Sequence, residues 1–458
     1  MKFNEIPHPR RIPLFGNVLD FKPQFIHKAF LKWAKDLGSV YKLHFFHKKI
    51  LVFSNPHHIN TLMRERPKKY KRVSVLGNVI TDVLGPGLFS SEGNDWKRQK
   101  RLMNRAFTDK QMINFFPILL KITERFGNHI RSLINTDPKV DIKSQLANFS
   151  IDVTTSFAFG YDGNITENST TDHQRDFSYT MYMINRRSLI PWPYWKYFKL
   201  PKDRKLDQAK GRIFDLIDRS IKDAKSKLGE GKEPTTILDT MILAGEDEEY
   251  PFTDEELKGN VVQMLFAGED TSSTTLTWAL YFLAIHPEYV EKLSREFQSL
   301  PPELDNLTFE HLKDLPLLEA VIFESLRLFP VSPFLFLESL DDGSVGDVEF
   351  PAGTPLVVLF QHNYLDETYF PEPTKFNPER WLDIDPTIKK DIFHPFGSGP
   401  RICPGRHLGL MEIKVLLIHL IQNFRFELET KKEEIQDELN FTLAPNKLVL
   451  KIKNKNPP

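Results

Sequence analysis

The sequence predicts a mainly α-helical protein with small β-sheets. Apolar residues recur at helical spacing beside charged faces over most of residues 95–330. Short runs of β-branched and aromatic residues, separated by turn residues, lie toward the two ends, near 39–55, 331–360 and 439–453. We expect a single domain over residues 1–458, because the sequence has no internal repeat and no low-complexity linker.

The first predicted element is a β-hairpin in residues 39–55, SVYKLHFFHKKILVFSN, with polar residues at its centre. Within the helical region, polar stretches near 160–175, 228–236 and 244–253 predict surface loops.

The C-terminal third changes character twice. Residues 331–380 carry Pro333 and the turn sequences DDG and PAG, which predict short strands and turns. A last helix is expected over about 404–423, and residues 439–455 predict a closing hairpin.

Composition excludes several classes of protein. The 458 residues contain 61 Lys and Arg against 61 Asp and Glu, so no basic excess favours nucleic-acid binding. A single cysteine cannot form an intramolecular disulfide. The start of the chain lacks a signal-like apolar stretch, and no apolar run reaches about 18 residues. We therefore expect a cytoplasmic protein without a membrane anchor.

The only cysteine lies in HPFGSGPRICPGRHLGL, residues 394–410. The simplest interpretation of Cys403 is a small buried apolar residue. However, a thiol just before a helix meets the positive end of the helix dipole, which favours the thiolate. Gly397 and Gly399 allow a tight turn, and Arg401 offers a cation for an anionic group. Thiolate, glycines and cation together suit a metal cofactor that carries carboxylates.

The pattern Phe396-x-x-Gly399-x-Arg401-x-Cys403-x-Gly405 resembles the haem-binding signature of the cytochromes P450, the haem-thiolate monooxygenases. The resemblance implies haem b (iron protoporphyrin IX), with Cys403 as the axial metal ligand and Arg401 on a propionate. It also implies the fold of that family, a triangular-prism helical body with haem between a kinked distal helix and the cysteine loop.

A second constellation lies in LLEAVIFESLRLFP, where Glu324 and Arg327 share a helical face. An exposed i,i+3 pair would contribute a few tenths of a kcal/mol, but the helix is strongly apolar and burial is expected. The segment FNPERW supplies Arg380. The three residues resemble the family's structural network behind the haem loop.

The segment VVQMLFAGEDTSSTTLTWALYFLA predicts an apolar helix whose pattern is interrupted by Gly268, Glu269, Asp270 and Thr271. A locally polar turn in a core helix would explain it. The i,i+4 spacing of Ala267 and Thr271 instead leaves a gap beside Gly268 that could admit a small ligand. The match to the family's Ala-Gly-x-acid-Thr motif implies O2 binding here, with Thr271 and Asp270 as proton-handling catalytic residues. Glu269 is expected to be a solvent-facing or structural carboxylate.

Near the front, Trp96 and Lys100 lie one turn apart in DWKRQKRLMNRAF. A solvated charged face is the ordinary explanation. In the family these positions contact a haem propionate; lysine at 100 keeps the charge but lacks the planar fork of arginine. The arginines on the other face, among them Arg98, would suit an acidic electron-transfer protein. Leu337 stands where the family often has a further arginine, so Lys71 or Arg72 could compensate.

The predicted activity is insertion of one oxygen atom from O2 into a C–H bond of a small lipophilic substrate, by fatty-acid-like hydroxylation or oxidative O-demethylation. The pattern is nearest to the haem domain of bacterial fatty-acid hydroxylases. Electrons from NAD(P)H would arrive through a separate ferredoxin or flavodoxin with its reductase, and a monomer is expected. Lys48 is a possible carboxylate anchor. The candidate pocket residues are Phe89, Phe266, Ala267, Val331, Leu443 and Ala444.

Two other functions remain open at this point. A haem-thiolate peroxygenase or isomerase would not use O2, which Asp270 and Thr271 argue against. A non-enzymatic haem sensor would bind the cofactor without turnover.

Overall fold

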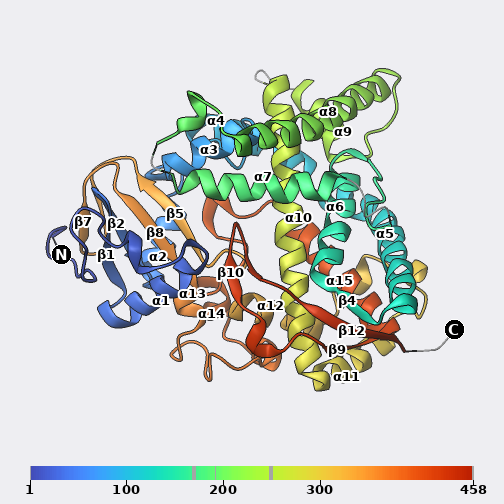
Figure 1. Cartoon of the computed structure of the whole chain (residues 1–458). Coiled ribbons are helices and arrows are strands. Elements are labelled where there is room, and N and C mark those ends of the chain that lie inside the picture. The colour runs from blue at the N-terminus through green and yellow to red at the C-terminus, as the bar shows by residue number, and fades with distance from the viewer. Residues whose placement is uncertain (1, 168–171, 191, 247–250, 456–458) are drawn as a thin grey trace. The chain divides into compact units, whose positions relative to one another are not determined.

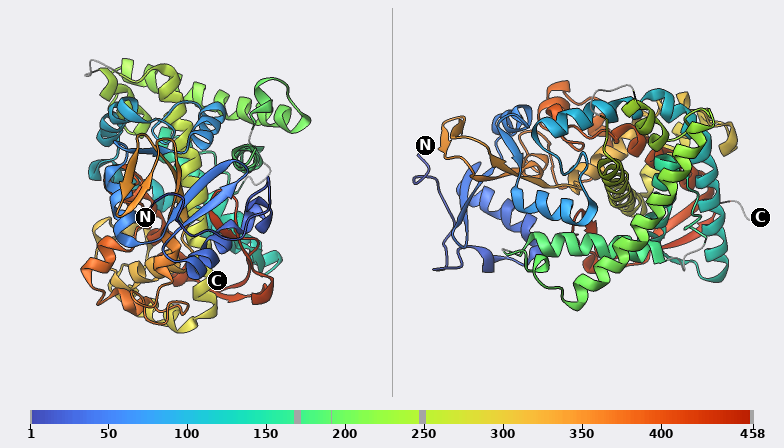
Figure 2. Two further views of the ribbon diagram at one scale, coloured as in Figure 1. Left: turned by 90° about the vertical axis from the view of Figure 1, so that its left-hand side faces the viewer. Right: turned by 90° about the horizontal axis from the view of Figure 1, so that it is seen from above.

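The computed structural model describes residues 2–167, 172–190, 192–246 and 251–455 (Figure 1). Parts of the predicted loops near 160–175 and 244–253 lie outside these ranges. The chain forms two compact units, each assembled from segments far apart in sequence (Figure 2). Unit one comprises Met1–Gly77, Ala320–Cys403 and Asp437–Ala444, and unit two comprises Asn78–Glu319, Pro404–Gln436 and Pro445–Pro458. The mainly helical class with small sheets is confirmed, whereas the single domain stays a prediction.

Unit one is organised around a five-stranded sheet of order β1-β2-β8-β5-β3. The predicted hairpin is present, because β1 pairs antiparallel with β2 from Val40↔Phe53 to Phe45↔Lys48. The strands of this sheet are β1 (Val40–Phe45), β2 (Lys48–Phe53), β3 (Tyr70–Arg72), β5 (Phe334–Ser339) and β8 (Pro355–Leu359). The helices are α1 (Ile26–Leu37), α2 (Pro56–Glu65), α13 (Phe360–Tyr364) and α14 (Pro386–Asp391), and a small hairpin joins β6 (Gly343–Val345) to β7 (Val348–Phe350).

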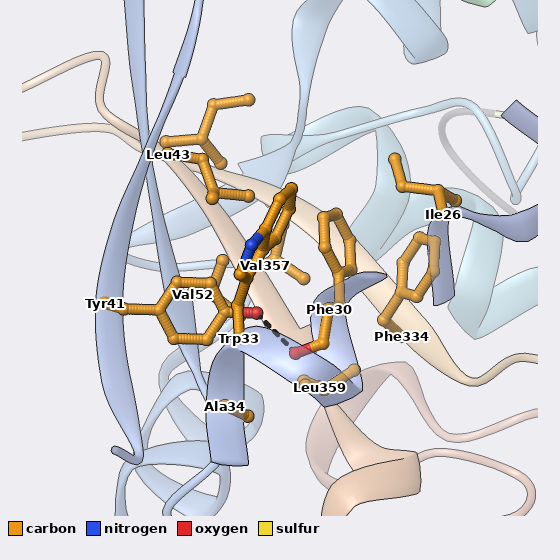
Figure 3. Packing of buried hydrophobic residues seen from close by; sticks show 11 residues of the cluster. Ile26, Phe30, Trp33, Ala34, Tyr41, Leu43, Val52, Phe334, Val357 and Leu359 are labelled. Atoms are coloured by element: carbon orange, nitrogen blue, oxygen red, sulfur yellow. Dashed lines mark hydrogen bonds between the residues drawn. The ribbon is translucent and has the colours of Figure 1, made fainter. Parts of the chain in front are cut away.

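The core of unit one forms where α1 packs on this sheet (Figure 3). Phe30 and Tyr41 are completely buried, and the rings of Phe30 and Phe334 meet edge to face with centroids 5.0 Å apart. The Tyr41 hydroxyl donates a 2.8 Å hydrogen bond to the backbone carbonyl of Phe30. This satisfies the hydroxyl in an otherwise apolar interior.

Unit two is largely helical, with α10 (Asp254–Ile285) at its centre. Thr253 and Glu256 form a capping box that fixes the start of α10, with backbone-to-side-chain hydrogen bonds of 3.0 and 3.1 Å. The other helices are α4 (Gly93–Ala106), α5 (Asp109–Thr136), α6 (Ile142–Phe159), α7 (Asp172–Ser188), α8 (Pro201–Gly229), α9 (Ile237–Glu246), α11 (Pro287–Glu296) and α15 (Arg406–Asn423). Two further helices cross the division between the units, α3 (Ser74–Leu84) and α12 (Pro316–Leu328). In the described residues, no helix combines the length and apolar character needed to cross a membrane.

The predicted closing hairpin over 439–455 is wrong. β12 (Val449–Asn454) lies instead between β4 (Lys139–Asp141) and β9 (Phe424–Leu428), antiparallel to both. This pairing buries Leu450 and Ile452, the alternate apolar residues of β12. A hairpin does form nearby, but between β10 (Asp437–Leu439) and β11 (Leu443–Pro445). Local alternation identified the strands but not their partners.

We predict that Tyr41→Phe lowers the free energy of unfolding by about 1 kcal/mol, because the ring still fills its site but the buried hydrogen bond is lost. Chemical denaturation followed by circular dichroism measures this change. Tyr197 has 73% of its surface exposed, so Tyr197→Phe serves as the control and should leave the unfolding free energy unchanged. Equal stability of wild type and Tyr41→Phe would contradict the prediction.

Candidate functional site

The cysteine loop is shaped by close contact with α2. Gly397 and Gly399 have φ angles of +71° and +68°, which residues with a Cβ rarely adopt. A Cβ on Gly399 would lie 2.4 Å from the backbone oxygen of Met63, so only glycine fits. The Cys403 N–H then donates to the Phe396 carbonyl at 2.9 Å and closes the loop. The predicted signature therefore forms a defined turn within unit one.

The Cys403 thiol is exposed, so the interpretation as a small buried apolar residue is wrong. The sequence has no second cysteine, so this thiol cannot enter an intramolecular disulfide, and as a thiolate it is a ligand suited to iron. Arg401 lies two residues earlier in a 3-10 helix, Gly399–Arg401, and is partly buried. This donor set, one thiol and one guanidinium, fits a haem with acidic side chains.

The helix after the cysteine begins later than predicted. Gly405 is the N-cap and Arg406 the first residue of α15, two residues after the expected start near 404. Pro404 stands in the turn before the helix rather than at its first position. Because the helix-dipole effect falls off within one turn, the thiol three residues ahead of α15 receives less of it than the sequence suggested.

Glu324 and Arg327 form the buried pair that the sequence predicted, and neither has any exposed surface. The Arg327 Nε and Nη2 atoms each donate to a Glu324 oxygen at 2.8 Å. The predicted third member joins them, because Arg380 Nε donates to Glu324 Oε1 at 3.1 Å. The pair is therefore a structural network, not a surface ion pair.

Two further donors complete this network and were not predicted. The Trp381 indole N–H donates to Glu324 Oε2 at 2.8 Å, and the Asn377 backbone N–H donates to Oε1 at 2.9 Å. Trp381 directly follows Arg380 in FNPERW. An indole ring is largely apolar but has one N–H donor, so its place beside the predicted Arg380 could have indicated a further donor to Glu324. Arg327 also donates to the carbonyls of Tyr364, Pro373 and Lys375, at 2.7, 2.6 and 3.2 Å. The network thus fixes the segment that leads toward the cysteine loop.

On α10, one face opens between buried stretches. Ala267 is exposed and Met264 and Thr271 are partly exposed, at helical positions i, i+3 and i+7. Thr271 Oγ1 donates to the Ala267 carbonyl at 2.7 Å, and Thr275 Oγ1 donates in the same way to Thr271 at 2.9 Å. The hydroxyls thus return to the carbonyls four residues earlier, a pattern that often bends helices. α10 runs without a break through Gly268, and the kink implied at this point stays a prediction.

Gly268 has a packing role within unit two. A Cβ at this position would lie 2.7 Å from the Thr154 hydroxyl of α6. Gly268 therefore allows α6 to pack closely on α10, while the predicted gap on the face of Ala267 and Thr271 and a contact of Gly268 with a cofactor stay predictions. Its neighbour Phe266 is buried against Phe177, with ring centroids 4.8 Å apart.

Two buried carboxyl groups lie in α10 and α15. Glu269 is buried, so the alternative that it faces solvent is wrong. Burial raises its pKa to about 8, and the nearby Asp270 makes a smaller contribution in the same direction. Burial also raises the pKa of Glu412 to about 8, although a hydrogen bond with Ser272 favours the ionised form. Both side chains are therefore largely neutral at pH 7. The sequence analysis did not predict the buried Glu412, although an acidic residue within the apolar run of α15 could have indicated it.

Trp96 and Lys100 are brought together on α4. Trp96 is buried, and the Lys100 ammonium lies 5.2 Å from the centre of its ring. Arg98 does not face outward as expected, because it pairs with Glu256 and donates to the Pro251 carbonyl at 3.0 Å. Arg101 and Arg105 are exposed, and they retain the basic face.

The remaining pocket candidates are placed in their own units. In unit two, the Phe89 N–H donates to Gln263 Oε1 at 2.9 Å, and the Phe89 side chain is partly exposed. In unit one, the Leu443 N–H donates to the Val331 carbonyl at 3.0 Å, and Ala444 is buried beside it. Their part in binding a substrate stays a prediction.

Leu337, the departure from the family pattern, is buried in β5 opposite Arg72 of β3. Lys71 lies 3.0 Å from Glu338 in an ion pair. This pairing makes Lys71 a poor substitute for the missing arginine.

We predict that Glu324→Gln lowers the free energy of unfolding by about 3–5 kcal/mol, because Arg327 keeps its charge in a buried site without its counter-ion. Chemical denaturation measures the loss. In the control Glu310→Gln, an exposed pair with Lys313 is removed, and the change should stay within about 1 kcal/mol. A similar small change in both variants would contradict the burial argument.

The raised pKa of Glu412 predicts a pH dependence of stability. Between pH 4.5, the ordinary pKa of the carboxyl, and about 8, the folded chain holds a proton that the unfolded chain releases. This contribution is complete below pH 4.5 and is lost as pH rises toward 8. The free energy of unfolding of wild type relative to Glu412→Gln should therefore fall by up to about 1.4 kcal/mol per pH unit in this window. Denaturation at several pH values tests this, and Glu310→Gln should follow wild type.

Comparison with known proteins agrees with these observations. Cytochrome P450 3A5 of Homo sapiens is 28% identical over 98% of this chain and 91% of its own length. Probable cytochrome P450 6a23 of Drosophila melanogaster is 28% identical over 93% of this chain and 89% of its own length. Cytochrome P450 97B2, chloroplastic, of Glycine max is 26% identical over 92% of this chain and 81% of its own length. The family model "Cytochrome P450" matches residues 6–452. The chain therefore belongs to the cytochrome P450 family.

Proposed function

We propose that this chain hydroxylates or O-demethylates a small lipophilic molecule, with a fatty-acid-like compound as the first class to test. Membership of the family makes the chain a haem-thiolate monooxygenase in general, an oxidoreductase that uses O2. The observation that carries the proposal is the exposed Cys403 thiol on a loop that Gly399 holds against Met63. The substrate class is proposed separately, from the apolar residues described below.

In this proposal Cys403 would hold the iron of haem b through its thiolate. Arg401, Trp96 and Lys100 would pair with its propionates, while Phe396 and Gly405 shape the ligand loop. When bound, the haem supplies the activation of O2. Lysine at 100 gives the propionate a point charge, since its ammonium lacks the planar fork of arginine.

The protein's own contribution to catalysis is the control of protons at α10. Thr271 Oγ1 donates its proton to the Ala267 carbonyl oxygen, with 2.7 Å between the two oxygens. Rotation of the hydroxyl can turn this proton toward a ligand on the open face of the helix. Asp270, after its carboxylate takes up a proton from solvent, would pass that proton to this hydroxyl. Ala267 leaves room on the exposed face because its side chain is a methyl group.

The substrate class is proposed from the apolar candidates Phe89, Phe266, Val331, Leu443 and Ala444. Lys48 is exposed at the start of β2 and could attract a carboxylate. The likeness to bacterial fatty-acid hydroxylases and the bacterial source also remain proposals, because the relatives described above come from a mammal, an insect and a plant.

Electrons from NAD(P)H would come through a separate ferredoxin or flavodoxin and its reductase. The exposed Arg101 and Arg105 of α4 offer a basic face for an acidic carrier. A cytoplasmic monomer remains part of this proposal.

The decisive experiment combines two variants. Cys403→Ser should abolish the thiolate-type spectrum of the carbon monoxide complex, because serine offers no thiolate. Thr271→Ala should keep that spectrum but lower product formed per NAD(P)H oxidised by about 10-fold or more, because proton delivery is lost. Thr277→Ala, a change in a buried hydroxyl of the same helix, is the matched control and should keep the wild-type ratio. An unchanged spectrum in Cys403→Ser, or full coupling in Thr271→Ala, would overturn the respective assignment.

A further inference from the structure

Tyr364, the last residue of α13, accepts hydrogen bonds on both its backbone and its side chain. Its carbonyl oxygen accepts a 2.7 Å hydrogen bond from Arg327 Nη1 of the buried network. Its hydroxyl oxygen accepts a 2.8 Å hydrogen bond from the backbone N–H of His394. His394 begins the cysteine loop, HPFGSGPRIC, which ends at Cys403. One residue therefore links the network to the start of this loop, and both contacts lie within unit one.

The Tyr364 hydroxyl is a neutral group in the interior. The residue is buried, and burial raises the pKa of the hydroxyl, although the hydrogen bond from His394 acts in the opposite direction. The hydroxyl oxygen therefore offers the same acceptor at any pH at which the protein works. His394 is buried too, so without this acceptor its N–H would be left unsatisfied, which costs more free energy than an ordinary hydrogen bond contributes.

Aromatic packing holds the residue just before the loop. The ring centroid of Phe393 lies 5.2 Å from that of Tyr364 and 4.5 Å from that of Trp381, a member of the network. Phe323 meets the same ring edge to face, with centroids 5.7 Å apart. Ring pairs of this kind add stability beyond the burial of their area. Phe393 is thus anchored, and the N–H that follows it is directed at the tyrosine hydroxyl.

From His394 the constraint passes along the backbone of the loop. The His394 carbonyl accepts a 3.0 Å hydrogen bond from the Gly397 N–H, and the Phe396 carbonyl accepts one of 2.9 Å from the Cys403 N–H. The close approach to α2 fixes the middle of the loop, and the hydrogen bond to the tyrosine hydroxyl fixes its beginning. The position of the thiol therefore depends on both supports.

We propose that Tyr364 is a positioning residue for the metal ligand. Its hydroxyl holds the start of the cysteine loop, so that the Cys403 thiolate stays bound to iron. This inference rests on the proposed function, in which Cys403 binds the iron of haem. Tyr364 takes no chemical step and acts only through the backbone of residues 394–403. A loop released at this end gives the sulfur more freedom to leave the metal and take up a proton.

The first test reads the hydrogen bond itself. Tyr364→Phe removes the acceptor but keeps the ring against Phe393, so the variant should fold. Hydrogen exchange of the haem-loaded protein, followed by mass spectrometry with residue-level fragmentation, reports the His394 N–H. This N–H should exchange about 10-fold faster in the variant than in wild type, because its acceptor is lost. An unchanged exchange rate would overturn the proposal.

The second test reads the ligand. In the reduced carbon monoxide complex, a thiolate and a protonated thiol give different spectra, and dilute urea converts the first form into the second. Tyr364→Phe should undergo this conversion about 10-fold faster than wild type, because one of the two supports of the loop is gone. If exchange at His394 rises while the conversion rate stays at the wild-type value, the hydrogen bond does not position the ligand and the proposal fails.

Tyr41→Phe is the matched control. It also removes one buried tyrosine hydroxyl that is bonded to the backbone in unit one, in this case to the Phe30 carbonyl at 2.8 Å. It lies on β1, outside the network and the cysteine loop. Exchange at His394 and the conversion rate should both stay within about 2-fold of wild type, because distant sites act independently. An equal effect of the two variants would indicate a general loss of stability and would count against the proposal.

Cys403→Ser separates this inference from the proposed function. If this variant keeps the thiolate-type spectrum, the ligand assignment fails and the inference fails with it. If the variant loses that spectrum while Tyr364→Phe behaves as wild type, the ligand assignment stands and only the role of Tyr364 is disproved.

Discussion

Two charges without any contact with water, Glu324 and Arg327, hold the segment that leads to the cysteine loop. Removing both from water costs several kcal/mol per ion, and the cost is offset only where every donor and acceptor is satisfied. Here Glu324 accepts five hydrogen bonds, and Arg327 donates five, two to Glu324 and three to backbone carbonyls. The carbonyls come from residues 364–375, which form no regular sheet. The ion pair thus replaces the backbone hydrogen bonds that secondary structure would supply.

The same reasoning separates rigid from responsive parts of the molecule. The cysteine loop is fixed by backbone contact at Gly399, which leaves no room for adjustment. On α10 the hydroxyl of Thr271 donates to the Ala267 carbonyl, and rotation about one bond can redirect it. The proposed function assigns a metal ligand to the first kind of support and a proton-handling hydroxyl to the second, as each role requires.

The sequence predicted the parts of the structure that local chemistry decides. Alternation and a polar centre were enough for the β1–β2 hairpin, and the spacing of Glu324 and Arg327 in an apolar helix was enough for their buried pair. It could not predict features that depend on distant partners. The position of β12 between β4 and β9 is set by burial of Leu450 and Ile452, and the need for glycine at 268 depends on Thr154, more than 100 residues earlier.

The two buried carboxyls of unit two, Glu269 and Glu412, make the folded chain a store of protons at neutral pH. When the chain unfolds, both groups meet water and release those protons to the solution. The buffer must take them up, and buffers differ widely in their heat of protonation. A calorimetric enthalpy of unfolding for this protein is therefore a property of the protein and its buffer together. Only measurements extrapolated over several buffers would isolate the part that belongs to the fold.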